Sequence, residues 1–370
     1  MRLNKLARIG SIAVAAGALL CTLASGWSIP PAAAQATAPD PADMRALVDA
    51  VNKEGGTLNV AWSNAVYGGA DGAKLFEAAI NEKYHTHLSI KFLPLSIPGF
   101  AFSNQVEQEV AAGQTASSDI LFDLHRSSEG PSFYEVDYRK YVPGLPEDAM
   151  WFGKRAVAVA SYLGGFYYNT KLVPANMVPH SLYDLLKPEW KGKIATPQIE
   201  GAQANFLTLP SGLGGDATLK FFGDFAKQVG GLIRCGTSDR VASGEFWIFG
   251  YDCGDGEARL AQRKGQPLAE FYPKEGTSLN YYAPGIPRTA AHPMAARMLI
   301  AYMLTPAGQA TLWNIMGLDY HKLPGSHLAA IIAEQRRKGT KIIEAYGLDA
   351  THPELDRYEK QIGDLVAQAH

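Results

Sequence analysis

The segment between residues 57 and 124 alternates strand-like and helix-like stretches, and this alternation limits the folds open to the chain. Strand-like stretches occupy 57–63, 88–93 and 119–124, and stretches with helical apolar spacing lie between them at 70–84 and 100–112. A β-α-β-α-β order in so short a segment predicts a parallel, doubly wound α/β sheet, because parallel neighbours need a crossover connection. In such a sheet, ligands bind beyond the carboxyl ends of the strands.

The second part of the chain repeats this pattern and predicts a second α/β unit. Strand-like stretches lie at 156–168, 193–198 and 246–252, with helix-like stretches at 181–187 and 219–229 and an extended stretch at 278–289. Further helices are predicted at 293–304, from Pro306 to Leu312, from Ser326 to Gly339 and from Pro353 onward. The chain has 370 residues, of which 47% are apolar, so it can build about two domains with sizeable cores.

The first 36 residues have the order of parts found in a secretory signal peptide. Arg2, Lys5 and Arg8 form a basic start, an apolar stretch follows at 9–24, and small residues then offer cleavage after Ala34 or Ala36. The apolar stretch is short of the ~20 residues that a membrane span needs. We therefore predict export with cleavage of residues 1–36. Their removal takes away three basic and no acidic residues, which changes the formal net charge from −2 to −5.

Export leaves two of the three cysteines, Cys235 and Cys253, in the mature chain. In an oxidising compartment we expect these two thiols to pair, and the alternative is two free thiols. A disulfide that closes a loop of this size stabilises by about 3 kcal/mol on the chain-entropy model.

The sequence contains no pattern typical of a catalytic site or of a nucleic-acid-binding protein. The chain has no G-x-S-x-G elbow, no H-E-x-x-H sequence and no phosphate-binding loop, and two mature cysteines suggest no structural zinc site. The near balance of 34 basic and 36 acidic residues offers no electrostatic footprint for nucleic acid. A long exported α/β chain of this kind suits a protein that binds a ligand between two lobes and closes about a hinge. We expect it to be no enzyme, and to use neither a metal nor a cofactor.

Four stretches in order carry a family resemblance. They are YYNTKLVP at 167–174, SLYDLLKPEWKGKIATP at 181–197, ASGEFWI at 242–248 and HPMAARMLIAYMLTPAGQ at 292–309. Together they resemble the signature of the extracellular solute-binding proteins of family 1. The branch of that family most similar to this chain contains ferric-ion, thiamine, phosphonate and polyamine binders.

The resemblance implies a type II periplasmic binding protein-like fold, in which two doubly wound α/β lobes are joined by a hinge. The first lobe would begin at 37–163, the second would occupy 164–275, and residues 276–370 would return to the first lobe and add C-terminal helices. It also implies a periplasmic, monomeric protein that delivers a small molecule to the permease and ATPase subunits of an ABC importer.

The candidate ligand-binding residues lie mainly in the loops that follow predicted strands. Ser63 and Asn64 follow the first strand and His125, Arg126 and Ser127 the third, while Gln203 lies at a predicted helix start. From the second lobe and its return we add Trp247, Tyr251, Asp252, Tyr281 and Tyr282. The alternatives without a ligand role are turn formation or helix capping by the polar residues, a surface position for Arg126, and core packing of the aromatic residues.

These residues leave the ligand class open. Arg126 can bind a carboxylate or phosphate bidentately, which favours a small anion. Asp252 could instead hold an amine, as in a polyamine or a thiamine-like cation. Ferric-ion members place adjacent tyrosines after the "G-E" stretch, whereas this chain has one, Tyr251, at that place. The alternative class is a secreted enzyme on the same scaffold, with His125, Glu245 and Asp252 as acid–base groups.

Overall fold

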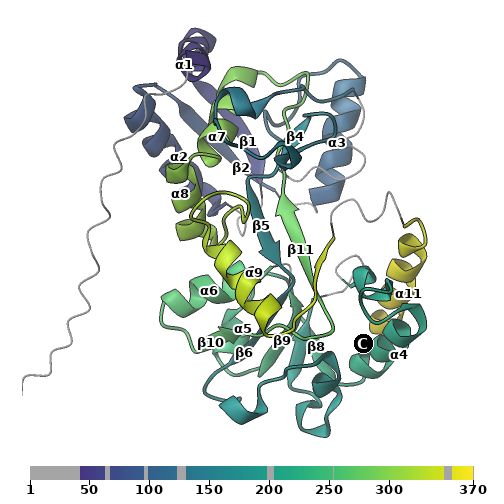
Figure 1. Ribbon diagram of the computed structural model, residues 1–370. Helices are drawn as coiled ribbons and strands as arrows, with labels where there is room; N and C mark the ends of the chain where they lie inside the picture. Colours follow the sequence, from purple (N-terminus) through teal and green to yellow (C-terminus); the bar gives the residue numbers. More distant parts are fainter. Residues whose placement is uncertain are drawn as a thin grey trace, which may run out of the picture. The chain divides into compact units, whose positions relative to one another are not determined.

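The computed structural model describes residues 42–62, 67–95, 99–122, 131–197, 204–252, 254–345 and 352–369 (Figure 1). At residues 42, 99, 100 and 252 it describes the backbone alone. All of these ranges belong to one compact unit, Asp40–His370. Within them, no helix combines the length and the apolar character needed to cross a membrane.

The first sheet confirms the parallel arrangement predicted for the start of the chain. Its elements are α1 (Ala42–Glu54), β1 (Thr57–Trp62), α2 (Gly69–Tyr84), β2 (Ser89–Pro94) and α3 (Gly99–Ala111). Strands β1 and β2 pair in parallel from Thr57–Ser89 to Trp62–Pro94. The crossover helix α2 joins them, as a parallel pair requires.

The third predicted strand, 119–124, is not a regular strand within the described residues. Ile120 forms an isolated parallel bridge with Val60, but its neighbour Leu121 bridges Gly285 in the antiparallel sense. Two backbone N–H groups of β1 donate to side chains of this segment and not to its backbone carbonyls. Ala61 N donates to Ser118 Oγ at 3.0 Å, and Asn59 N donates to Asp119 Oδ2 at 2.7 Å. The segment still runs beside β1, as predicted, but most of its bonding is irregular.

The second sheet has five strands in the order β10-β6-β9-β7-β8. These are β6 (Gly165–Asn169), β7 (Ile194–Thr196), β8 (Val229–Leu232), β9 (Ile248–Asp252) and β10 (Leu268–Glu270). Strand β7 is parallel to β8 and β9, whereas β6 is antiparallel to β9 and β10, so the sheet is mixed. Its helices are α4 (Gly215–Ala226), α5 (Asp239–Ala242) and α6 (Gly256–Arg263).

The predicted helix at 181–187 is a short 3-10 helix, Leu182–Leu186. Ser181 and Asp184 form a capping box at its start, and a second 3-10 turn, Pro188–Trp190, begins directly after Lys187. Proline disfavours a helical conformation in the residue before it, so the first helix ends within two turns.

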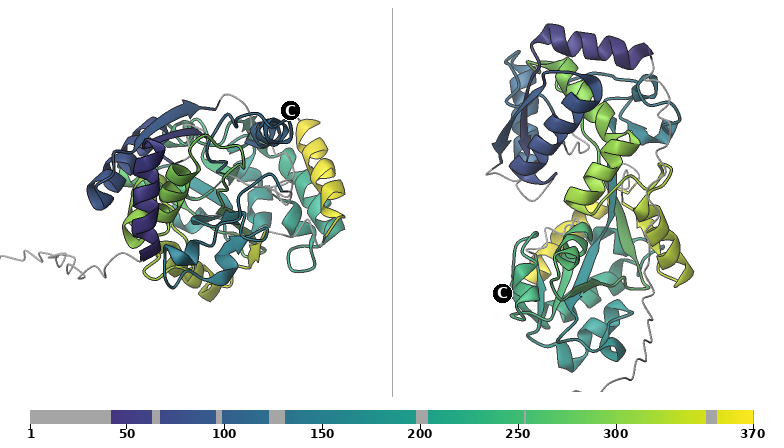
Figure 2. Two further views of the ribbon diagram at one scale, coloured as in Figure 1. Left: turned by 90° about the horizontal axis from the view of Figure 1, so that it is seen from above. Right: turned by 90° about the vertical axis from the view of Figure 1, so that its left-hand side faces the viewer.

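A third, three-stranded sheet links the parts built around the first two. Its order is β12-β11-β5, with β5 (Ala160–Leu163), β11 (Thr277–Tyr282) and β12 (Ile342–Glu344). Strand β5 runs into β6 with Gly164 alone between them. The figures show β5 and β11 side by side along the middle of the molecule (Figures 1 and 2). A further two-stranded sheet pairs β3 (Met150–Trp151) with β4 (Ala156–Val157).

The helices after β11 return to the first sheet. They are α7 (Pro293–Met303), α8 (Pro306–Met316) and α9 (His327–Arg337). Their buried residues Met298, Leu312 and Ile332 share one core with Leu58 and Val60 of β1. We call the residues of this core the first lobe, and those packed around the five-stranded sheet the second lobe. The last helix, α11 (Leu355–Ala367), contributes Ile362 and Val366 to the second core and packs against α4.

Candidate functional site

The carboxyl ends of the first-lobe strands meet in a group of aromatic rings. Trp62 ends β1, and its ring lies 4.6 Å from that of Phe122, edge to face. Phe92 of β2 lies 5.4 Å from Trp62. Trp62 Nε1 is buried and has no hydrogen-bond partner among the described residues. This edge of the sheet is therefore closed from within by aromatic surface.

These rings continue to the crossing strands. Tyr67 lies 4.5 Å from Phe122 and 5.5 Å from Tyr282 of β11, and Tyr282 lies 5.1 Å from Tyr162 of β5. A β-carbon on Gly254, in the second lobe, would lie 3.1 Å from Tyr162 Cδ2. We call Trp62, Tyr67, Phe122, Tyr162 and Tyr282 the strand-end cluster. It joins the end of β1 to the crossing strands and to the segment that follows β9.

Several predicted ligand residues lie outside the described residues, namely Ser63, Asn64, His125, Arg126, Ser127 and Gln203. The structure does describe the points from which their loops depart. Trp62 precedes residue 63 and Phe122 precedes the segment at 123–130, and these two rings are in contact. The segments that carry Ser63 and Arg126 therefore begin at neighbouring points at the carboxyl edge of the sheet.

The second lobe has a matching edge. Strands β7 and β9 are parallel neighbours, with Ile194 opposite Ile248, so their carboxyl ends lie at one edge. The segment that contains Gln203 follows β7, and Asp252 is the last residue of β9. Trp247 precedes β9 and so lies at the opposite edge, where Lys193 Nζ sits 3.8 Å from its ring centre. The structure brings the starts of the Gln203 and Asp252 segments together and leaves Trp247 apart from them.

Tyr251 occupies a β-bulge at the end of β9. The register shifts so that Gly165 pairs with Asp252 and Phe166 with Gly250, which leaves Tyr251 as the extra residue. Its φ of 61° is left-handed, a conformation uncommon outside glycine. The ring lies in the second core, 4.7 Å from Phe166, and burial, with Glu275 nearby, raises the pKa of the hydroxyl well above its usual value. Bulges are frequent beside binding sites, where they redirect the following residue.

Tyr281 and Tyr282 lie on opposite faces of β11, because side chains alternate along a strand. Tyr282 belongs to the strand-end cluster. Tyr281 is buried against Trp151 at 4.8 Å, and its hydroxyl donates to Glu344 Oε1 at 2.5 Å. Burial and this carboxylate raise the pKa of Tyr281. The pair therefore does not form one continuous aromatic wall.

The groups proposed for the enzymatic alternative are not assembled within the described residues. Glu245 pairs with Arg240 on the surface, with Arg240 Nε 2.7 Å from Glu245 Oε2, and this pairing lowers the pKa of the carboxyl. His125 and the Asp252 side chain lie outside the description. Among the described residues, no three His, Cys, Asp or Glu side chains are grouped so that they could hold a metal ion.

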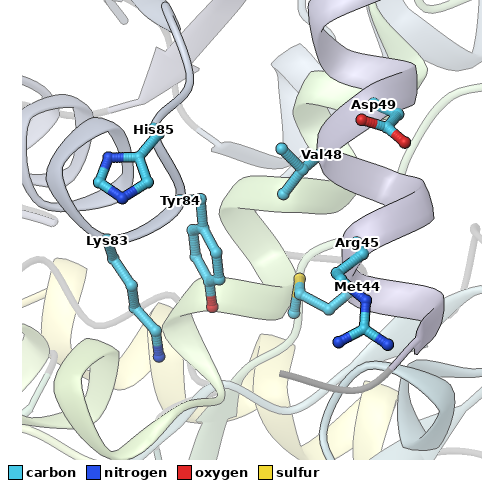
Figure 3. Close-up of a pocket in the computed structure, with 7 residues that line it drawn as sticks. All are labelled: Met44, Arg45, Val48, Asp49, Lys83, Tyr84 and His85. Atoms are coloured by element: carbon cyan, nitrogen blue, oxygen red, sulfur yellow. The ribbon is translucent and has the colours of Figure 1, made fainter. Parts of the chain in front are cut away.

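A surface pocket elsewhere in the first lobe has a volume of about 300 Å³ (Figure 3). Its lining comes from α1 and from the end of α2: Met44, Arg45, Val48, Asp49, Lys83, Tyr84 and His85. His85 lies between α2 and β2, which places the pocket near the amino ends of the parallel strands. It is therefore separate from the strand-end cluster.

The sequence reasoning did not single out Trp62, Tyr67, Phe122 or Tyr162. Trp62 and Phe122 lie near the ends of predicted strands and shortly before predicted ligand residues, so position alone was a usable signal for them. Tyr162 lies two residues before Gly164, where the chain crosses between the lobes, so its position was also a usable signal. Tyr67 offered no such pattern.

A parallel sheet and a mixed sheet, each flanked by helices and joined by crossing strands, with strand ends gathered beside the crossing, define the type II periplasmic binding protein fold. The chain belongs to the family of bacterial extracellular solute-binding proteins, whose model matches residues 100–324. The expected family and fold class are thereby confirmed, and the family is one of solute binders and not of enzymes. No curated protein gives a significant match.

Solved structures agree with this fold. A substrate-binding protein of an ABC transporter from Agrobacterium tumefaciens is 17% identical, with a TM-score of 0.62. The match covers 84% of this chain and 96% of the Agrobacterium chain. The spermidine/putrescine-binding PotD from Streptococcus pneumoniae is 15% identical, with a TM-score of 0.58 and coverages of 85% and 99%. Iron-bound HitA from Pseudomonas aeruginosa is 14% identical, with a TM-score of 0.58 and coverages of 85% and 98%.

Proposed function

We propose that the protein is the periplasmic solute-binding component of an ABC importer, which captures a small polar anion in a cleft between its lobes and delivers it to permease and ATPase subunits. The observation that supports this most directly is the strand-end cluster. It joins the carboxyl edge of the first sheet to both crossing strands and to Gly254 after β9. Open α/β sheets bind ligands at such edges.

The proposed ligand contacts come from both lobes. Ser63, Asn64, His125, Arg126 and Ser127 would reach the ligand from the first lobe, and Gln203 and Asp252 from the second. Tyr282 would supply an aromatic surface between them. Pockets for small ligands commonly combine aromatic walls with a few placed polar groups. Tyr251 and Tyr281, which are buried, would support the site from behind, and Trp247 would take no part.

An anionic ligand follows from Arg126. Its guanidinium offers paired N–H donors that match a carboxylate or a phosphate, and the neighbouring serines add hydroxyl donors. The segment that carries it follows Phe122, whose ring contacts Trp62. A cationic ligand held by Asp252 is the outcome that would contradict this choice.

The test is a thermal-shift screen of the purified protein against single metabolites, among them carboxylates, phosphate esters, phosphonates, polyamines and ferric citrate. A ligand at 100 times its Kd stabilises the folded state by about 2.7 kcal/mol, which raises Tm by several degrees. We expect hits among anions, with a response that Arg126→Ala abolishes and that the exposed-residue control Arg357→Ala retains. Hits confined to amines, or an anion response unchanged by Arg126→Ala, would overturn the proposed ligand class, and turnover of a hit would overturn the binding role.

We also propose that export removes residues 1–36 and that Cys235 pairs with Cys253. Cys235 precedes α5 in the second lobe, and Cys253 lies outside the described residues. Amino-terminal sequencing of the periplasmic protein should begin after Ala34 or Ala36. Peptide mapping without reductant should yield one peptide pair that contains both cysteines, and a free thiol at either position would contradict the pairing.

A further inference from the structure

Helix α6 of the second lobe meets the end of α8 of the first lobe in a contact between backbones. Ala258 and Ala261 of α6 are buried in the second lobe, whereas Leu312 and Met316 of α8 belong to the first core. A β-carbon on Gly256 would lie 2.2 Å from Met316 O, and one on Gly317 would lie 2.8 Å from Gly256 O. Only glycine allows so close an approach. We call this contact, with Arg259, Arg263 and Trp313, the α6–α8 joint.

Two arginines of α6 cap the end of α8 from the other lobe. Arg263 Nη1 donates to Trp313 O at 2.9 Å, and Arg259 Nη1 donates to Gly317 O. The last carbonyls of a helix lack partners within it and carry partial negative charge, so cations are favourable there. The Arg263 guanidinium also lies 4.5 Å from the centre of the Trp313 ring, which adds a cation–π contact.

Arg259 is held rigidly in this position. It is 7% exposed and donates to Asp255 Oδ2 at 2.6 Å, with its Nε 3.2 Å from Glu270 Oε1. The Tyr272 hydroxyl lies 2.9 Å from Asp255 Oδ2. A buried ion pair of this kind is costly to break, because removing one partner leaves an uncompensated charge. The α6 side of the joint therefore cannot adjust by simple side-chain rotation.

The joint also adjoins the crossing between the lobes. Asp255 N donates to Leu163 O at 3.1 Å, and Leu163 is the last residue of β5 before Gly164. Asp255 in turn follows the segment 252–254, where we place part of the ligand site. A change at the joint is thus only a few bonds away from both the crossing strands and the second-lobe side of that site.

We propose that the α6–α8 joint is the fixed point about which the two lobes rotate, and that its two arginines limit the range of angles between them. A backbone contact locked by a buried arginine resists rearrangement, so rotation of the lobes would have to take place in the crossing strands β5 and β11. The inference deepens the proposed function and rests on it, since rotation of the lobes has a purpose only if they close on a ligand. It concerns the protein without ligand, so it can be tested separately.

The experiment measures the distance between the lobes by pulsed electron–electron double resonance. Nitroxides on ketone side chains introduced at Lys74 of α2 and Lys220 of α4, both exposed, leave the cysteines untouched. We compare the otherwise unaltered protein with Arg259→Met and Arg263→Met. The matched control is Arg240→Met, in the same lobe, whose arginine pairs with Glu245 and does not contact α8 within the described residues.

We expect a single narrow distance population in the unaltered protein and in Arg240→Met. Arg259→Met and Arg263→Met should each add a second population of roughly 10% of the molecules or more, as for a minor state that has become accessible. Arg263 is exposed, so this variant should fold even if Arg259→Met does not. An unchanged distribution in Arg263→Met and in any folded Arg259→Met would overturn the inference. A failed ligand screen with the expected distances would overturn the proposed function alone.

Discussion

Gly164 and Ser278 approach each other so closely that a β-carbon on Gly164 would lie 2.8 Å from Ser278 Oγ. Gly164 N donates to Ser278 O at 2.8 Å, and Thr277 Oγ1 donates to Gly164 O at 3.0 Å. The single residue between β5 and β6 is therefore fixed by β11 on both of its backbone groups. The point at which the chain passes from one lobe to the other is a hydrogen-bonded contact and not a free loop.

Gly164→Ala should destabilise the protein by about 1–3 kcal/mol, the usual cost of overpacking. The matched control is Gly223→Ala in α4, where the nearest side-chain atom, Leu365 Cδ2, lies 3.9 Å from the new β-carbon. That change should stabilise by about 0.5–1 kcal/mol because alanine favours the helix. Urea unfolding of both variants measures the difference. Equal effects would contradict the close contact at the crossing.

Glu270 should give the folding stability a pH dependence. Burial raises its pKa to about 7 from 4.5, although neighbouring Arg259 opposes the shift. Between these values the folded protein holds a proton that the unfolded chain has released, so this contribution to stability falls as the pH rises from about 4.5 to about 7. Glu270→Gln should remove that slope, which cannot exceed about 1.4 kcal/mol per pH unit. The free energy of unfolding of both proteins is measured at pH 5 and at pH 7.5, with exposed Glu189→Gln as the control. The same pH dependence of stability in Glu270→Gln and in the unaltered protein would refute the prediction.

His321 should act in the opposite direction. Burial, with Lys322 nearby, lowers its pKa to about 4 from 6.5, and its Nδ1 lies 2.9 Å from Ser161 Oγ. Between these pH values His321 is protonated in the unfolded chain and neutral in the folded protein. Stability is therefore lost as the pH falls from about 6.5 to about 4. His321→Gln should lose less stability on acidification, and exposed His87→Gln should behave as the unaltered protein. An acid sensitivity that survives His321→Gln would place its cause elsewhere.

The two adjacent tyrosines should differ in their effect on ligand binding. Tyr282→Ala removes a ring of the strand-end cluster and should abolish the ligand-induced rise in Tm for any hit from the screen. Tyr281→Phe removes the hydroxyl that binds Glu344 and should cost about 1 kcal/mol of stability without changing that rise. Equal losses of binding in both variants would show that the two faces of β11 are not functionally distinct.

Much of the fold was predictable because its signals are local. The predicted helix at 100–112 is α3, and those at 293–304 and from Ser326 correspond to α7 and α9. Helix α1 was not predicted, although Met44, Leu47 and Val51 are buried at helical spacing. It begins within the proline- and aspartate-rich residues 38–43, which are typical of a loop. A regular strand at 119–124 was predicted from its β-type residues. Those residues do not reveal that the side chains of Ser118 and Asp119 accept hydrogen bonds from backbone N–H groups of β1.

The candidate site was less predictable, because it depends on contacts between distant parts of the chain. Alternation along β11 could have separated Tyr281 from Tyr282, but the bulge that turns Tyr251 into the core has no sequence signature. The α6–α8 joint depends on close contact between Gly256 and Gly317, which belong to different lobes. No sequence pattern around either glycine predicts this contact.

The return of α7 and α8 to the first core determines the order in which the protein can be completed during synthesis. Leu58 and Val60 of β1 need Met298, Leu312 and Met316 to close their core, so the amino-terminal strands must wait for a segment made about 240 residues later. The strands of the five-stranded sheet lie wholly between these parts of the sequence, but their core includes Ile362 and Val366 of α11. Both cores are therefore completed only when the carboxyl-terminal helices have been made.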